Sequence, residues 1–306
     1  MTKGIVVAMA DEFKGIAFDD LVTVTKMKHI VEIQYMEKRN SECKIQKIDK
    51  DRYIDKDTGE VHEYEHIENR QGSLNSLRKT FKRLRYLINN NFEGLSNELH
   101  VTLTYAENMT DTKRLYTDVE KFVKRLRYEY KDVTTVDYLN VVEPQGRGAW
   151  HCHMLMRFND IKSVYIKNEK LRELWGHGFV TIKSLKDVDN IGAYLSAYLT
   201  DIELDDKRLS PEDVMNIGIN QHEVVTKVID GQEKKFIKGG RLHMYPPGMN
   251  LYRKSKGIKA PNRENMRYNY AKKIVGAATP HYEKTYHIET EDFQNTIHFQ
   301  QYNLKR

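Results

Sequence analysis

The chain has 306 residues, which is long enough for one large domain or two modest ones with a buried core. Hydrophobic residues make up 39% and charged residues 31%, and no stretch reaches the roughly 20 apolar residues of a membrane span. These values exclude a membrane-embedded protein and predict a water-soluble globular one. The apolar run at residues 5–10 is too brief for a secretory signal peptide.

Charge and cysteine usage indicate the kind of partner and the compartment. The formal net charge is +6, and Lys and Arg gather on particular segments, which indicates a polyanionic partner. The two cysteines, Cys43 and Cys152, form neither a Cys-x-x-Cys pair nor a disulfide framework, so we expect a cytoplasmic protein. No Gly-x-x-x-x-Gly-Lys-[Ser/Thr] sequence is present, so no helicase-type ATPase is expected within these residues.

Residues 1–70 predict short strands and loops, with a β-hairpin over 52–62 that turns at 57–59. The overlapping residues 62–66 match the zinc-protease pattern His-Glu-x-x-His. That pattern needs a helix that presents both histidines on one face, whereas this segment is a charged hairpin arm. We therefore do not interpret it as a metal site.

Two amphipathic helices with basic exposed faces are predicted next. The first spans residues 73–90, with Ser73 as N-cap, and the second follows Asp111 and buries a stripe from Leu115 to Leu126. Such charge is usually only solvated, but the first helix has five basic residues and no acid, which makes phosphate contacts an equal alternative. The candidate phosphate-binding side chains on these helices are Arg78, Lys79, Lys82, Arg83, Lys121, Lys124 and Arg125.

Two strands joined by a tight turn are predicted at residues 137–143 and 150–157. The turn contains Gly146 and Gly148, which allow the chain to reverse within a few residues. Glu143, at the end of the first strand, is therefore expected to lie about opposite the start of the second.

The second strand of this hairpin carries two histidines. Side chains alternate across a strand, so His151 and His153 share one face, and Cys152 points to the other, where core packing is expected. Both imidazoles then converge with the Glu143 carboxylate on one patch of an antiparallel sheet. A His-x-His pair alone is weak evidence in a chain with 12 histidines. The carboxylate at hairpin distance favours a divalent-metal site with open coordination positions.

The remaining elements complete an α+β order. A strand is predicted at 100–105, a short helix ends near Trp175, a strand covers 179–183, and a helix runs from Asp187 to about Ile202. Together with the hairpin, these elements predict a central antiparallel sheet with helices packed on it and with basic N- and C-terminal extensions.

Beyond about residue 205 the periodic pattern weakens. A hairpin is predicted at 223–237, and residues 239–262 predict an extended basic segment that wraps the domain. This segment adds the candidate phosphate-binding side chains Arg253, Lys254 and Lys256. We divide the chain into an N-terminal β-hairpin region with a basic helix at 1–95, a central domain at 96–205, and a basic C-terminal extension at 206–306.

The last predicted helix of the central domain carries Tyr194 and Tyr198, four residues apart and therefore on one face. With 19 tyrosines one such pair is expected by chance, and aromatic residues at helical spacing are usually core. A phenol is a poor nucleophile at neutral pH because its pKa is about 10. A cation that polarises a phosphodiester makes attack by a phenol feasible, and the products are a covalent phosphotyrosine and a free hydroxyl.

These motifs together resemble the HUH endonuclease superfamily, specifically the rolling-circle replication initiators of plasmids and phages. Residues 100–105 resemble the first family motif, an apolar-Thr-Leu-Thr strand. Residues 151–156 match the second, His-apolar-His followed by three apolar residues, and 190–198 resemble the third, the nucleophile helix. Glu143 is placed where many members have an acidic third ligand. The resemblance covers about residues 97–205.

The resemblance implies an HUH- or RRM-like, ferredoxin-like sandwich that binds Mg²⁺ or Mn²⁺. It implies that Glu143, His151 and His153 hold the cation and that Tyr194 or Tyr198 supplies the nucleophile. The implied activity is a metal-dependent tyrosine endonuclease and strand transferase that nicks one DNA strand at a replication origin. This reaction starts rolling-circle replication.

The implied partner is DNA, as an origin hairpin and as a single strand, contacted by the basic side chains named above and by Arg147 in the hairpin turn. A host helicase is expected because the sequence has no ATPase motif, and no membrane partner is expected. Many relatives carry a Lys three residues after the nucleophile, whereas Ala197 and Asp201 occupy the two equivalent positions here. Which tyrosine attacks therefore stays open.

Two alternatives remain at this point. The first is the same chemistry in another setting, that of a relaxase or a transposase. The second is a nucleic-acid-binding regulator without catalysis, although the aromatic pattern of RNA-recognition folds is missing around residues 101–105. His177, between two glycines, is a further candidate ligand.

Overall fold

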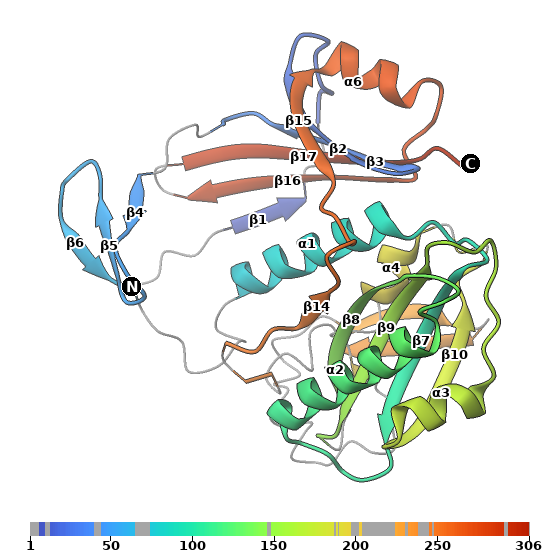
Figure 1. The fold of residues 1–306 in the computed structure, drawn as a ribbon. Helices are drawn as coiled ribbons and strands as arrows, with labels where there is room; N and C mark the ends of the chain where they lie inside the picture. Colours follow the sequence, from blue (N-terminus) through green and yellow to red (C-terminus); the bar gives the residue numbers. More distant parts are fainter. Residues whose placement is uncertain are drawn as a thin grey trace. The chain divides into compact units, whose positions relative to one another are not determined.

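The chain forms two compact units, one made of residues 1–67 with 261–306 and the other of residues 68–260 (Figure 1). The computed structural model describes residues 6–9, 13–39, 44–64, 74–145, 148–186, 188, 190–196, 202–203, 224–229, 232–237, 245–246, 248–290 and 293–305. Both units combine antiparallel sheets with helices, which confirms the predicted α+β class. Among the described helices, none is long and apolar enough to cross a membrane.

The second unit, residues 68–260, is built on a five-stranded antiparallel sheet. The strand order is β10-β7-β9-β8-β14, so the two strands predicted as a hairpin, β8 and β9, lie at its centre. The elements of this unit are α1 (Leu74–Asn91), β7 (Glu98–Tyr105), α2 (Thr112–Glu129), β8 (Val136–Pro144), β9 (Trp150–Phe158), α3 (Asn168–Trp175), β10 (Gly178–Ser184), α4 (Ile191–Ser196), β11 (Ile202–Glu203), β12 (Val224–Ile229), β13 (Gln232–Ile237) and β14 (Tyr252–Lys254).

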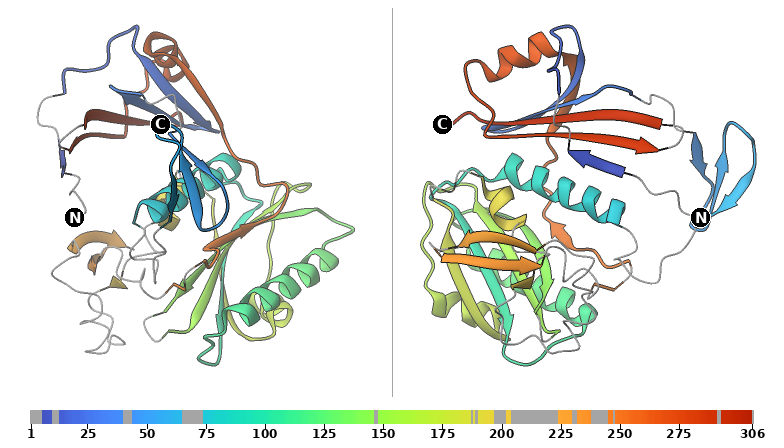
Figure 2. Two further views of the ribbon diagram at one scale, coloured as in Figure 1. Left: turned by 90° about the vertical axis from the view of Figure 1, so that its left-hand side faces the viewer. Right: turned by 180° about the vertical axis from the view of Figure 1, so that it is seen from behind.

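One face of this sheet is covered by α2 and α3 (Figures 1 and 2). The side chains of β9 that point to this face, Cys152, Met154 and Met156, are fully buried and join the apolar stripe of α2 in one core. Asp111 caps α2 by accepting hydrogen bonds from the backbone N–H groups of Lys113 and Arg114. The core role expected for Cys152 is thus confirmed.

The opposite face of the sheet is covered by α1 and α4. Leu139, Val141 and Leu155, from the two central strands, pack in a second core with the apolar residues of α1. The two residues of α4 that join this core are Ile191 and Leu195, four positions apart and so on one side of the helix. Strand alternation therefore separates two helical layers, and α4 lies on the face to which His151 and His153 point.

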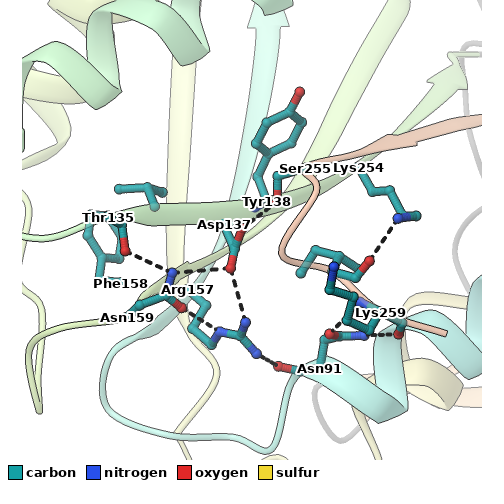
Figure 3. Close-up of polar contacts among 12 residues, drawn as sticks. Asn91, Thr135, Asp137, Tyr138, Arg157, Phe158, Asn159, Lys254, Ser255 and Lys259 are labelled. Atoms are coloured by element: carbon teal, nitrogen blue, oxygen red, sulfur yellow. Dashed lines mark hydrogen bonds and ion pairs between the residues drawn. The ribbon is translucent and has the colours of Figure 1, made fainter. Parts of the chain in front are cut away.

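The segment after β14 is tied to the sheet by a polar network around Asp137 of β8 (Figure 3). The Asp137 carboxylate accepts hydrogen bonds from Ser255 Oγ at 2.7 Å and from Asn159 Nδ2 at 3.1 Å, and Arg157 lies 3.1 Å away as an ion pair. Burial raises the pKa of Asp137, but these hydrogen bonds outweigh it, so the pKa is lowered overall. The predicted extended segment is therefore fixed to the edge of the sheet in this part.

Most elements of the second unit agree with the sequence prediction, and one helix does not. The helix expected from Asp187 to about Ile202 is α4, Ile191–Ser196, and Ile202 lies in β11, paired with Ile237 of β13. The N–H of Val188 bonds the carbonyl of Leu185 in a turn, so the chain before α4 is not helical. The hairpin predicted at 223–237 is confirmed as β12 and β13.

The first unit contains a six-stranded sheet of order β1-β16-β17-β3-β2-β15 and a separate three-stranded sheet of order β4-β5-β6. Its helix α6 packs on the large sheet through Ala271 and Val275, which join Val22 and Ile33 in one core. The elements of this unit are β1 (Val6–Met9), β2 (Leu21–Met27), β3 (Ile30–Met36), β4 (Ile45–Lys47), β5 (Arg52–Asp55), β6 (Val61–Glu63), β15 (Asn262–Arg267), α6 (Tyr268–Val275), β16 (Tyr282–Thr290) and β17 (Phe293–Asn303).

These units do not coincide with the predicted segments 1–95, 96–205 and 206–306. Strand β3 pairs with β17 and β2 pairs with β15, so the two ends of the chain share one sheet. Helix α1 belongs instead to the unit that carries the histidines. The small hairpin is confirmed: Tyr53 pairs with His62, so the first histidine of the zinc-protease pattern lies on a strand and not on a helix.

We predict that Gly257→Ala destabilises the protein by about 1–3 kcal/mol, because a Cβ at this position would meet the carboxylate of Asp137, which its hydrogen bonds hold in place. In an Asp137→Ala background the same change should cost less than about 0.5 kcal/mol, since the obstacle is gone. Urea unfolding of the four proteins measures both values. An equal cost in the two backgrounds would contradict the close contact.

Candidate functional site

The turn between β8 and β9 sets the register of the histidines. The Gln145 N–H bonds the Ala149 carbonyl at 2.7 Å and the Gly148 N–H bonds the Gln145 carbonyl at 2.8 Å. Gly148 has φ +83°, a conformation that favours glycine. The resulting register places Glu143 directly opposite His151, which confirms the expected pairing across the hairpin.

Glu143 and His153 are in direct contact on the face covered by α1 and α4. Glu143 Oε2 lies 2.7 Å from His153 Nε2, and the Glu143 residue is only 6% exposed. The other ring nitrogen of His153, Nδ1, lies 3.3 Å from His100 Nε2 and 3.3 Å from Thr102 Oγ1 on β7. The ring centroids of His151 and His153 are 6.4 Å apart. The strands thus bring one carboxylate and three imidazoles to one face.

Burial keeps the imidazoles of this cluster neutral. Desolvation lowers the pKa of His153 to about 4. Desolvation, with smaller effects from His153 and Lys183, lowers the pKa of His100 to about 3. A neutral His153 satisfies its contacts when Nε2 carries the proton and donates it to Glu143, while Nδ1 accepts from Thr102 or His100. Neutral imidazole is also the form that binds a metal ion.

The donor types of the cluster suit a divalent cation, but the geometry is that of a hydrogen-bonded pair. Imidazole nitrogen and carboxylate oxygen are ligands that Mn²⁺ accepts readily and Mg²⁺ less tightly. Within the part of the chain that the structure describes, no group of three or more His, Cys, Asp and Glu side chains is arranged to hold a metal ion. The closest approach is the contact of His153 with Glu143, where a proton occupies the shared position.

Helix α4 carries Tyr194 and is docked tightly against α1. The N–H of Gly192 bonds Asn89 Oδ1 at 2.8 Å, and a Cβ on Gly192 would overlap the side chains of Asn89 and Arg85. Glycine therefore allows the two helices to approach closely. The side chain of Tyr194 and all of Tyr198 lie outside the described residues, so the placement of the predicted nucleophiles stays a prediction.

The basic side chains fall on two sides of the sheet. Lys79 and Arg83 of α1 and Lys254 of β14 line one pocket on the face of Glu143 and the histidines. Lys82 lies over the ring of Tyr86, 5.4 Å from its centroid. Lys256, in the turn after β14, is exposed.

The candidates of α2 lie on the opposite side. Lys121 is exposed, Lys124 pairs with Glu120 at 2.7 Å, and Arg125 donates to the Trp175 carbonyl at 3.3 Å. Arg253 points to the same side, 3.7 Å from the ring centroid of Tyr116. Arg147 and the side chain of Arg78 lie outside the described residues.

Two residues near the cluster were missed from the sequence. His100 lies two positions before Thr102 on β7, so alternation alone was enough to place it on the face of His153. Phe179 of β10 pairs with Thr104, which pairs with His151, and Phe179 is 63% exposed. An aromatic side chain thus stands at the end of the row that holds His151 and Glu143.

His177, the further candidate ligand, belongs to the other side of the sheet. Its ring lies 5.0 Å from that of Trp175, and its Nε2 lies 3.5 Å from Asp118 of α2. It therefore does not join the cluster of His100, His151 and His153.

Comparison with known proteins bears on this unit. Residues 98–203 match the family model of the replication-associated proteins of the ORF2 type. The match covers about a third of the chain, and it contains β7, the β8–β9 hairpin and α4. No curated protein and no solved structure matches the chain. The family match supports a role in the initiation of DNA replication and, with it, an interaction with DNA.

We predict that the protein without added metal loses stability as the pH falls from about 6.5 towards 4. The pKa of His153 and of His100 is lower in the folded than in the unfolded chain, so the unfolded state takes up more protons in this range. Each such group contributes a slope of about 1.4 kcal/mol per pH unit. Urea unfolding in EDTA at several pH values should show a smaller slope for His100→Gln. A reduction as large for the control His62→Gln, at a partly exposed position on β6, would contradict the assignment.

Proposed function

We propose that this protein is a site-specific, metal-dependent DNA strand transferase of the HUH type that nicks a replication origin and starts rolling-circle replication. The observation that carries the proposal is the register of β8 and β9, which puts Glu143 opposite His151 and in contact with His153, on the sheet face that α4 covers. The match of residues 98–203 to a replication-associated family supports the same function.

Glu143, His151 and His153 are the proposed ligands of Mn²⁺ or Mg²⁺. The bound cation would act as a Lewis acid on the scissile phosphate and stabilise the negative charge that develops there. His100 and Thr102 are positioning residues in this proposal, because their contacts with Nδ1 leave Nε2 of His153 facing Glu143. Burial keeps the ligand imidazole neutral at physiological pH, so no proton has to leave His153 through solvent.

Tyr194 or Tyr198 is the proposed nucleophile. The phenol oxygen forms a bond to phosphorus while the bond from phosphorus to one sugar oxygen breaks. The phenol proton is lost, and the leaving sugar oxygen gains a proton to become a free hydroxyl. A polymerase extends only a 3′ hydroxyl, so an initiator must keep the 5′ phosphate on its tyrosine. The phosphodiester energy is retained in the phosphotyrosine, so a second hydroxyl can later rejoin the strand.

The proposed substrate is single-stranded DNA exposed at an origin hairpin. The basic candidates contribute a salt-sensitive affinity for its phosphates. Unwinding of the flanking duplex would fall to a host helicase. A relaxase or a transposase would use the same covalent step, and the sequence of the cleaved site would distinguish these settings.

We predict that Tyr194→Phe combined with Tyr198→Phe abolishes the protein–DNA adduct and leaves DNA binding within about twofold. The substitution removes the attacking oxygen and keeps the ring that packs. The assay incubates Mn²⁺ with oligonucleotides labelled on either side of the cleavage site and resolves the products on a denaturing gel. The label on the 3′ side should migrate with the protein.

The matched control for this double variant is Tyr165→Phe, at a tyrosine that is 84% exposed. It should form the adduct as the unchanged protein does. Loss of binding together with cleavage in the double variant would mean that the pair is structural.

We predict that Glu143→Gln lowers adduct formation by at least about 100-fold at a fixed Mn²⁺ concentration, because the amide is a much weaker ligand than the carboxylate. EDTA should abolish the adduct of the unchanged protein. Gel quantification over a Mn²⁺ titration measures both effects. A protein that binds the oligonucleotide but leaves it intact at every Mn²⁺ concentration would instead be the non-catalytic regulator.

A further inference from the structure

A pocket of about 440 Å³ lies between α1 and the segment that leads into β14. This volume is within the range of small-molecule sites, so the pocket holds more than a single ion. Both walls belong to the second unit and lie outside the residues that match the replication-associated family. The pocket is therefore a feature of this chain beyond the part that the family model describes.

The pocket is lined by three cations and by no carboxylate. Lys79 and Arg83 are four residues apart on α1 and so lie on one side of that helix, and Lys254 faces them from β14. Within the described part of the chain, neither Lys79 nor Arg83 forms an ion pair with a carboxylate. The ammonium group of Lys254 donates to the Ile258 carbonyl at 2.7 Å, which leaves its charge uncompensated. Such a site favours an anion, and phosphate is the anion that a nucleic acid supplies.

The pocket also holds an aromatic side chain, that of Tyr252. Tyr252 pairs with Val141 across the sheet edge and is partly exposed, so its ring has one side in the pocket. Aromatic rings in basic grooves bind unpaired bases by stacking, and a base inside a duplex cannot reach such a ring. The combination of three cations with one ring thus fits a nucleotide of a single strand better than a duplex.

The pocket opens on the same sheet face as the histidine cluster. Val142 donates its N–H to the Leu251 carbonyl at 3.0 Å, so the pocket residue Leu251 lies beside Val142, one position before Glu143. Two strand spacings separate β14 from β9, which is about 10 Å. A strand bound at Glu143 and the histidines would reach the pocket within a few nucleotides.

We propose that this pocket binds one nucleotide of the single-stranded DNA substrate, with Lys79, Arg83 and Lys254 on its phosphates and Tyr252 against its base. This inference rests on the proposed function, since it assumes that DNA occupies the face of Glu143. It adds a specific subsite that lies beyond the reacting phosphate and fixes the strand on that side.

The test measures binding of a fluorescein-labelled single-stranded oligonucleotide by anisotropy, in EDTA and over a range of salt concentrations. Lys79→Gln combined with Arg83→Gln should reduce the slope of log K against log [salt] by about 0.7 for each phosphate that the variant no longer neutralises. The matched control is Lys162→Gln combined with Lys167→Gln, two exposed lysines of the same unit with the same change in charge. An equal reduction in the control would overturn the proposal, because it would show only the effect of a lower net charge.

The aromatic part of the proposal has its own variants. Tyr252→Leu should weaken single-strand binding by about fivefold or more and leave duplex binding unchanged, whereas Tyr252→Phe should bind as the unchanged protein does. An equal weakening for duplex and single strand would overturn it. Thermal unfolding confirms that each variant is folded.

The failure of this proposal is distinguishable from that of the nicking function. At saturating oligonucleotide with Mn²⁺, the pocket variants should still form the covalent adduct. If the unchanged protein forms no adduct, the nicking function fails, and the anisotropy measurements still decide whether the pocket binds a single strand.

Discussion

The antiparallel pairing of β8 with β9 is the constraint on which the candidate site depends. A shift of one residue in this register would move both histidines to the face of α2 and α3, where Cys152 and its neighbours are buried. That shift would expose three core side chains and bury two imidazoles among apolar groups. The packing of the core and the chemistry of the site thus select the same register, and neither can change without the other.

The two helical layers have different tasks. The core beneath α2 and α3 holds the sheet together, whereas α1 and α4 cover the face that carries Glu143 and the histidines. The tight approach at Gly192 ties α4 to α1, so the segment of the proposed nucleophile is held by a helix that precedes the family-matched region. Residues outside that region therefore contribute to the geometry within it.

The sequence predicted the central sheet well because its signals are local: alternation over β7 and β9, the glycine turn, and the apolar stripes of α1 and α2. It did not predict β16, β17 and α6. Strand β17 buries Asn295, His298 and Gln300, whose polar groups are satisfied by hydrogen bonds, so it lacks the apolar alternation that identifies a strand. The pocket beside Tyr252 was also beyond prediction, since its walls lie about 170 residues apart and meet only through the pairing of β14 with β8.

The pairing of β3 with β17 and of β2 with β15 makes residues 68–260 an insertion within the sheet of the first unit. On the ribosome, the inserted unit has all its strands available before β16 and β17 have been synthesised. The early strands β2 and β3 must meanwhile wait with unpaired edges, which are prone to associate with other chains. Incomplete translation products would therefore carry a folded inserted unit and an aggregation-prone N-terminal segment.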